Sequence, residues 1–286
     1  MTTLPSVAAV IPVRNRQALT LRFLTALSQQ TYPNLTAFVV DSASTDGTPA
    51  AVRRDFPQVR VIEVCDRNYW TGATNHGVRA ALTEGFEFIL TINDDAVIPL
   101  DHIERLVGRA TQYQLNILGN RIDYLSQPGL IWSLGTQINW NRPKMITLRY
   151  QDYRAEHLPP SVQAADILPV DTLPGNGVLI HRSVFEAIGL YNAGLLPHYH
   201  GDSELLLRAR QAGFQSFVAP DVILLNDFSK AQKAVQLSSP GALYATFCRP
   251  KSHLYLPPLV YLFFRYCFTP VSLVWSGLQA RSRPET

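Results

Sequence analysis

The chain has 286 residues, enough for one large domain or two small ones. Apolar residues make up 47% of it and charged residues 16%, so it can bury a sizeable core and is not intrinsically disordered. The net charge of +3 is too small to predict nucleic-acid binding, and three widely separated cysteines fit neither a zinc site nor a disulfide framework.

The first hundred residues alternate between predicted strands and predicted helices. Short β-rich runs predict strands at 7–13, 36–40, 59–64 and 88–92. Apolar periodicity predicts helices at 17–30, from the turn at 42–48 through 54, and at 74–84. This alternation predicts an α/β fold with a mostly parallel sheet covered by helices on both faces. Ligands of such sheets bind at the carboxyl ends of the strands.

The sequence from residue 120 to residue 225 predicts its helices and strands less clearly. Residues 120–173 are rich in aromatic residues and prolines, which predicts irregular or antiparallel structure. We expect this segment either to shape a binding cleft or to be a poorly patterned part of the core. Further along, the sequence predicts a strand at 178–181, a helix at 183–188, a helix at 203–212 that ends before Gly213, and a strand at 222–225.

The segment 254–278 is strongly apolar and carries one charged residue, Arg265. Three prolines interrupt it, so its apolar stretch is shorter than the roughly 20 residues that a spanning helix needs. A helix there would gather its polar side chains within about 80° of its circumference; these are Arg265, Thr269, Ser272, Ser276 and Gln279. Two interpretations stay open: contact with a membrane interface through 254–280, or packing on the chain's own domain or on a second copy in a homodimer.

Adjacent acids follow the fourth predicted strand. Asp94 and Asp95 would offer the oxygen ligands that Mg²⁺ or Mn²⁺ prefers beside a substrate phosphate. Neighbouring side chains of an extended chain point to opposite sides. One acid could therefore hold a metal while the other faces a sugar hydroxyl. The alternative is ordinary turn chemistry, for which Asn-Asp-Asp is a common sequence.

Three more residues are candidates for binding or catalysis. Asp41 ends the second predicted strand, and its carboxylate could accept a hydrogen bond from the ring N–H of a pyrimidine. Asp202 precedes a predicted helix, where it could be an N-cap or a general base that removes a proton from a hydroxyl. Trp70 could stack on a sugar or a base, or belong to the core.

Four segments, in this order, resemble the glycosyltransferases of family 2; they are residues 11–15 (IPVRN), 40–48 (VDSASTDGT), 93–95 (NDD) and 201–213 (GDSELLLRARQAG). The resemblance covers roughly residues 7–227, and the rhamnosyltransferase-like branch is the most similar. It implies an inverting enzyme of GT-A fold, with a C-terminal apolar helical segment added. Such an enzyme moves a sugar from a nucleoside-diphosphate donor to a hydroxyl of a glycan or lipid-linked acceptor.

The resemblance also implies a role for particular residues. Those expected around the nucleotide are Pro12, Arg14, Asn15, Asp41, Asn75 and Asp94. Asp95 would hold the divalent metal, Mg²⁺ or Mn²⁺, and Asp202 would be the general base. The residues expected beside the donor sugar and the acceptor are Trp70, Gly175, Asn176 and Gly177.

The chain departs from the family pattern at three places. Asn93 replaces the first Asp of the metal motif, which implies weaker metal binding. Gly201 stands where an acid often precedes the base, and Asn226 and Asp227 stand where many relatives have a His.

The expected organisation is a catalytic domain at 1–230 and a helical, membrane-associating tail at 231–286. Within the domain, 1–119 would bind the nucleotide and 120–230 the acceptor. The first apolar run is short and is followed by arginines, so no secretory signal is expected. This predicts a cytoplasmic protein, at the inner face of the membrane if the tail binds there.

Two other functions compete with this one. A non-catalytic, membrane-attached scaffold of the same fold is favoured by Asn93 and Asn226, but disfavoured by the presence of Asp41, Asp95 and Asp202. A sugar nucleotidyltransferase would carry a Gly-rich loop after its first strand, and residues 12–17 contain no Gly.

Overall fold

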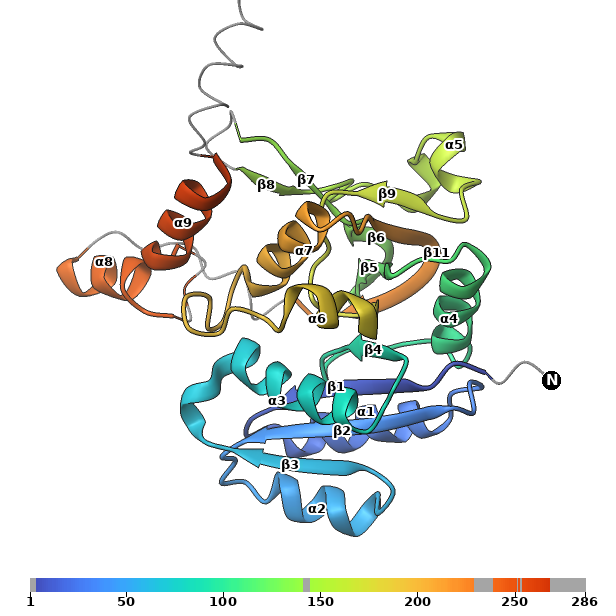
Figure 1. Ribbon diagram of the computed structural model, residues 1–286, viewed down its shortest axis with the longest axis vertical. Coiled ribbons are helices and arrows are strands. Elements are labelled where there is room, and N and C mark those ends of the chain that lie inside the picture. The colour runs from blue at the N-terminus through green and yellow to red at the C-terminus, as the bar shows by residue number, and fades with distance from the viewer. Residues whose placement is uncertain (1–3, 141–144, 229–238, 251, 253, 268–286) are drawn as a thin grey trace, which may run out of the picture.

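The computed structural model describes residues 4–140, 145–228, 239–250, 252 and 254–267. Within these residues nine strands form one sheet (Figure 1), in which eight follow the order β3-β2-β1-β4-β10-β5-β11-β9 and β6 pairs with β5. The strands are β1 (Val7–Val13), β2 (Leu35–Ser42), β3 (Arg60–Val64), β4 (Phe88–Thr91), β5 (Ile117–Tyr124), β6 (Gln127–Ser133), β9 (Leu168–Val170), β10 (Val178–His181) and β11 (Ser216–Asn226).

The two ends of the sheet differ in strand direction. β1 runs parallel to β2 and β4, and β2 runs parallel to β3, which confirms the predicted first half. β10 is antiparallel to both β4 and β5, whereas β11 is parallel to β5. The carboxyl ends of β1, β2 and β4 therefore share one edge of the sheet, where a ligand site is expected.

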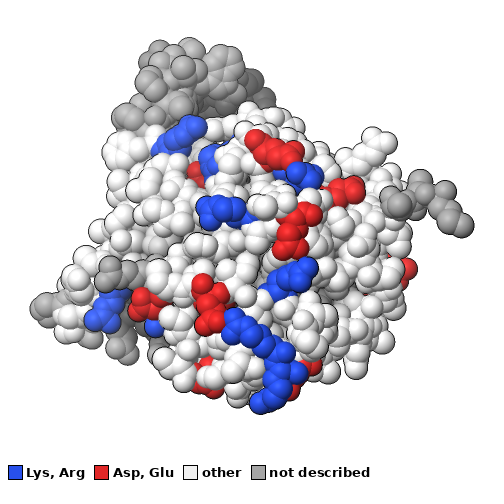
Figure 2. All heavy atoms as spheres, turned by 60° about the horizontal axis from the view of Figure 1, so that its bottom comes forward, with Lys and Arg blue, Asp and Glu red and all other residues white. Residues whose placement is uncertain are grey.

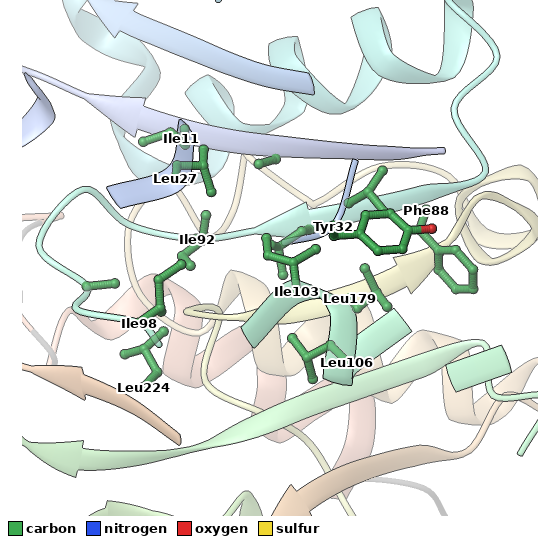
Figure 3. Packing of buried hydrophobic residues seen from close by; sticks show 14 of the residues in the cluster. Ile11, Leu27, Tyr32, Phe88, Ile92, Ile98, Ile103, Leu106, Leu179 and Leu224 are labelled. Carbon is green, nitrogen blue, oxygen red and sulfur yellow. The ribbon is translucent and has the colours of Figure 1, made fainter. Parts of the chain in front are cut away.

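Helices cover both faces, as predicted. Alternate residues of β1 enter two different cores, Ala9 and Ile11 on one side and Ala8 and Val10 on the other. The first core, shown in Figure 3, is covered by α1 (Gln17–Ser28), α2 (Thr48–Asp55) and α4 (His102–Gln112). The second is covered by α3 (Tyr69–Thr83), α6 (Arg182–Ile188) and α7 (Gly201–Gln211).

Strands within residues 120–173 form antiparallel pairs, which agrees with the antiparallel structure predicted as one alternative for this segment. β6 pairs antiparallel with β5, and β9 pairs antiparallel with β11. β7 (Thr136–Ile138) and β8 (Ile146–Leu148) form a separate two-stranded sheet. A short helix, α5 (Pro160–Gln163), precedes β9.

The sequence predicted neither α4 nor β5. β5 carries Asn120, Arg121 and Asp123 in its interior, a polar composition that is unusual for a buried strand. The Arg121 guanidinium donates to the Asp123 carboxylate at 2.9 Å, so these two charges are paired inside the protein. α3 begins at Tyr69, before the predicted start at residue 74. Thr71 and Gly72, in this earlier part of the helix, are buried.

The C-terminal described elements are α8 (Pro240–Phe247), α9 (Leu256–Leu262) and a π-helical turn (Phe263–Cys267). Two prolines occupy the first turn of α9, where their missing N–H groups are not needed. Leu262 is buried against Leu196 and Leu207, so one side of this segment packs on its own domain. The other predicted polar positions, Thr269, Ser272, Ser276 and Gln279, lie outside the described residues.

None of the helices in the described part of the chain combines the length and the apolar character needed to span a bilayer. On the face that Figure 2 shows, charged residues of both signs are interspersed among broad uncharged areas. Exposed ion pairs of the described residues include Arg53 with Glu63 and Arg54 with Asp55.

Candidate active site

Hydrogen bonds join the loops that follow β1 and β2. The Asn15 N–H donates to Ser44 Oγ at 2.7 Å, and Asn15 Oδ1 accepts from the Thr45 N–H at 2.7 Å. Asp41, buried near the end of β2, accepts from the Ser44 N–H through Oδ2 at 2.8 Å. Its other oxygen, Oδ1, is buried and has no hydrogen-bond partner among the described residues. This oxygen is therefore an acceptor that a nucleotide base could use.

Pro12 and Arg14 flank the same loop. Pro12 lies in β1 beside Val40 of β2 and is half-buried. Arg14 is exposed, and its guanidinium donates to the backbone carbonyl of Asp66 at 3.2 Å. The structure thus places both near the end of β2, with Arg14 held toward the start of α3, and their contact with a nucleotide stays a prediction.

The two acids after β4 converge on one arginine. Arg16 Nε lies 3.1 Å from Asp94 Oδ1, and Arg16 Nη2 donates to Asp95 Oδ2 at 2.8 Å. Asp94 Oδ2 also accepts from the Thr20 hydroxyl at 2.8 Å. Burial raises the pKa of Asp94 to about 6, although the Arg16 guanidinium opposes this rise. The acids do lie in a turn, as the alternative held, but their carboxylates reach across to α1.

Arg16 and Thr20 were not among the predicted site residues. Arg16 is the N-cap of α1, and Thr20 lies in the first turn of this helix, four residues later. The buried side of the helix is otherwise apolar, with Phe23, Leu24 and Leu27. A basic residue and a hydroxyl at the start of a helix, in a chain with an acidic pair at a neighbouring strand end, is the signal that could have identified them.

A chain of hydrogen bonds connects the acidic turn to Asp202. Trp70 Nε1 donates to Asn93 Oδ1 at 2.9 Å, and the Asn93 N–H donates to Asn176 Oδ1 at 2.9 Å. The Gly175 N–H then donates to Asp202 Oδ2 at 2.8 Å. Because Asn93 directly precedes the acidic pair, Asp202 and that pair belong to one connected site.

The loop at 175–177 needs its glycines. A Cβ at Gly175 would lie 2.7 Å from the Trp70 ring. Gly177 has a φ of +82°, and a Cβ there would lie 1.7 Å from Asn120 Oδ1. Between them, Asn176 is buried and its Nδ2 has no hydrogen-bond partner in the part of the chain that the structure describes.

Asp202 is not the N-cap of α7, so that alternative is wrong. The helix begins at Gly201, and His200 occupies the N-cap position in a left-handed conformation with a φ of 65°. Asp202 lies in the first turn and is half-buried. Its oxygens accept from the Gly175 N–H and, at 2.7 Å, from the Ser203 N–H. Two fixed donors thus orient the carboxylate beside the glycine loop.

Asn75 and Trp70 both contact Tyr191, and their predicted roles in ligand binding stay predictions. The Asn75 amide donates to the Tyr191 carbonyl at 2.8 Å, and its Oδ1 accepts from the Tyr191 N–H at 2.9 Å. These bonds tie α3 to the loop before α7, and nucleotide contact by Asn75 stays a prediction. The half-buried Trp70 ring packs edge-on against Tyr191, with the ring centroids 5.8 Å apart.

A divalent cation would find one free carboxylate oxygen here. Asp95 Oδ1 is buried and has no hydrogen-bond partner among the described residues. Those residues contain no group of three or more His, Cys, Asp or Glu side chains that could enclose a metal. One carboxylate completed by a diphosphate and water is a common Mg²⁺ arrangement, so the site fits such an ion. Asn226 is buried, and its Oδ1 has no hydrogen-bond partner among the described residues.

Known proteins resemble this chain in sequence and in fold. It is 25% identical over 228 residues to the N-acetylglucosaminyl-diphospho-decaprenol L-rhamnosyltransferase of Mycobacterium tuberculosis, covering 72% of this chain and 70% of the relative. It superimposes on S. aureus TarS 1–349 with a TM-score of 0.57 and 14% identity, over 78% of this chain and 60% of that one.

A second structural likeness is to GalNAc-T7 solved with UDP, GalNAc and Mn²⁺, with a TM-score of 0.63 and 14% identity, over 79% of this chain and 44% of that one. These likenesses confirm the predicted GT-A fold. The model of the family "Glycosyl transferase family 2" matches residues 8–166. This match covers more than half of the chain, so the chain belongs to glycosyl transferase family 2 and is a nucleotide-sugar glycosyltransferase, similar to the rhamnosyltransferase-like branch.

Proposed function

We propose that this enzyme transfers a sugar, with inversion, from a nucleoside-diphosphate donor to a hydroxyl of a glycan or lipid-linked acceptor. The observation that carries the proposal is the connected site in which Asn93 and the 175–177 loop link the acidic turn to Asp202. The mycobacterial relative is named for rhamnosyl transfer to a diphospho-decaprenol-linked sugar, which supports the acceptor class.

In this proposal residues 1–119 bind the nucleotide and residues 120–230 bind the acceptor. The free Oδ1 of Asp41 accepts from the base, and Asp94 approaches the ribose. Arg14 and Asn15 line the same pocket from the loop after β1. The Asn176 Nδ2, buried without a hydrogen-bond partner among the described residues, would donate to the donor sugar or its diphosphate.

Asp95 would hold Mg²⁺ or Mn²⁺ through its free Oδ1. A bound cation there would neutralise charge on the departing diphosphate. Asn93 stands where the family has the first Asp of its metal motif. Its Oδ1 still accepts a hydrogen bond from Trp70 Nε1. A structural neighbour was solved with UDP and Mn²⁺, which supports a divalent metal in this enzyme.

Asp202 acts as the general base. Its carboxylate, held by the Gly175 and Ser203 N–H groups, accepts the proton of the acceptor hydroxyl. The acceptor oxygen forms a bond to the anomeric carbon while the bond from that carbon to the diphosphate oxygen breaks on the opposite face. The transition state has oxocarbenium character, by analogy with glycoside hydrolysis.

The test is the Asp202→Asn variant. Since general-base catalysis contributes about 10²–10⁴-fold, sugar transfer should fall by that factor. UDP or dTDP should bind with unchanged affinity in calorimetry, because the Asp202 carboxylate accepts from the Gly175 and Ser203 N–H groups and neither residue is assigned to the nucleotide. Asp55→Asn, an exposed acid of α2, is the matched control and should transfer normally. Normal turnover by Asp202→Asn would overturn the base assignment.

The competing functions make different predictions. A scaffold without chemistry would show neither slow hydrolysis of a nucleotide sugar nor a thermal shift with metal and UDP. A sugar nucleotidyltransferase would form a nucleotide sugar from a sugar phosphate. The family match and the absence of Gly at 12–17 disfavour this second alternative.

We also propose peripheral contact with the inner face of a membrane through the C-terminal segment. Tyr261, Leu262 and Tyr266 pack inward, whereas Phe263 and Phe264 are 43% and 57% exposed. An amphipathic helix of this kind can lie in the headgroup region of a bilayer. A lipid-linked acceptor would be reached from that position, and a homodimer formed through the same face is the alternative.

A further inference from the structure

Arg16 is the residue that contacts both acids of the turn. Its Nε and Nη2 atoms face Asp94 and Asp95 separately, at 3.1 and 2.8 Å, in a forked geometry suited to a guanidinium. Asp94 is fully buried, while the Arg16 side chain is 36% exposed. The arginine therefore covers the acids from the solvent side and neutralises one of their two negative charges.

This position conflicts with binding of a free metal ion. A divalent cation at Asp95 Oδ1 would lie on the carboxylate whose other oxygen already bonds Arg16. Like charges this close repel, and the effect is strong at partly buried sites. A donor diphosphate changes the balance, because its negative charges can pair with both the guanidinium and the metal.

We infer that Arg16 is a positioning residue that reserves the acidic pair for the donor-bound enzyme, so that the divalent cation binds together with the nucleoside diphosphate and only weakly without it. The inference rests on the metal-assisted function proposed above. Arg16 competes with the metal for Asp95 in the free enzyme and pairs with phosphate oxygens in the complex. Metal and nucleotide consequently bind with positive coupling, each raising the affinity for the other.

The experiment measures Mn²⁺ binding by electron paramagnetic resonance, with and without UDP, for the full chain. Without UDP, Arg16→Gln should bind Mn²⁺ on the order of tenfold more tightly than the wild type, because one repelling charge is removed. UDP should tighten Mn²⁺ binding strongly in the wild type and much less in Arg16→Gln. This readout requires no sugar transfer.

Two further variants serve as controls. Arg22→Gln removes the same charge from an exposed position of α1 and should bind Mn²⁺ like the wild type. Arg16→Lys retains the charge and should also stay within about twofold of the wild type, since competition depends on charge. If Arg16→Gln fails to fold, Arg16→Met, which also removes the competing charge, replaces it in the experiment.

The outcomes separate the two proposals. Equal Mn²⁺ affinity of Arg16→Gln and wild type without UDP, with UDP-dependent binding in both, would overturn the role of Arg16 alone. Tight binding by Arg16→Lys would also overturn it, because the charge would not be the cause. A wild type that binds no Mn²⁺ even with UDP would overturn both this inference and the metal part of the proposed function, but leave Asp202 untouched.

Discussion

His102 is a titratable residue enclosed in the core at the start of α4. Only 1% of its surface is exposed, and the groups that face it include the Ile223 backbone, Asn120, Asp101 and Arg105. Burial, the largest cause, lowers the pKa of His102 to about 4. The neutral ring is therefore favoured in the folded protein, whereas the unfolded chain would titrate near the ordinary value of about 6.5.

Folding stability should depend on this histidine between pH 6.5 and pH 4. In that interval the unfolded state binds more protons than the folded state, so the free energy of unfolding rises with pH. The contribution of His102 is complete above about pH 6.5 and is lost as the pH falls through about 4. Relative to His102→Gln, the wild type should lose up to about 3 kcal/mol over this interval.

Urea denaturation at several pH values checks this prediction. Asp94, whose pKa is raised to about 6, contributes with the opposite sign, since its stabilising effect is lost as the pH rises through 6. The difference between wild type and His102→Gln cancels that contribution. His157→Gln, an exposed histidine, should show no such difference. Parallel pH curves for wild type and His102→Gln would contradict the prediction.

For single residues, the sequence predicted the acids of the candidate site better than the side chains that contact them. Asp41, Asp94 and Asp95 were predicted because strand ends of a parallel sheet share an edge, and the structure places them there. Arg16 was not predicted because its role depends on the spacing between α1 and β4, which is a tertiary property. Asn75 was predicted at the nucleotide, but its two hydrogen bonds to a backbone 116 residues away were not, because they too depend on tertiary structure.

Among the elements, α7 connects the base to the C-terminal segment. Glu204, two residues after Asp202, is fully buried and accepts from Arg208 Nε at 2.9 Å. The hydroxyls of Tyr261 and Tyr266 donate to the same Glu204 oxygen at 3.2 and 3.3 Å. Burial and this carboxylate both raise the pKa of each tyrosine, which keeps the hydroxyls protonated as donors.

Substitution of a tyrosine and substitution of Glu204 should lower the free energy of unfolding by different amounts. Tyr266→Phe deletes one hydrogen bond but retains the ring that stacks on Trp140, so the free energy of unfolding should fall by about 1 kcal/mol. Glu204→Ala leaves the half-buried Arg208 guanidinium without its acid and both tyrosine hydroxyls without this acceptor, and should cost about 3 kcal/mol. Chemical denaturation of both variants measures the two losses. Equal losses would contradict the assignment of Glu204 as the centre of this contact.

The elements that the sequence missed have a physical reason in common. β5 was not predicted because its polar residues resemble a loop until Arg121 and Asp123 are seen to pair within the sheet. The start of α7 was placed too late because Gly201 and Asp202 resemble a cap, whereas His200 takes the left-handed position instead. In each case a tertiary contact offsets an unfavourable local preference.

The proposed site draws on both halves of the sheet. The loops that we propose bind the nucleotide follow β1, β2 and β4, and Asp202, the proposed base, lies in α7. α9 packs beside α7 (Figure 1) through Leu262 and Leu207, so the C-terminal segment adjoins the helix that carries Asp202. This arrangement is suited to an acceptor whose hydroxyl is presented from a membrane surface.

Binding of the full chain to vesicles tests that arrangement. The wild type should sediment with vesicles of phosphatidylglycerol and phosphatidylcholine, and the double variant Phe263→Ser, Phe264→Ser should bind at least about tenfold more weakly, since partial burial of each ring contributes about 1 kcal/mol or more. Leu100→Ser, which replaces an equally exposed residue near α4, should bind like the wild type. Unaltered binding of the double variant, or a wild type that stays in the supernatant, would contradict membrane contact; a concentration-dependent dimer lost in the double variant would show instead that this face joins two copies of the chain.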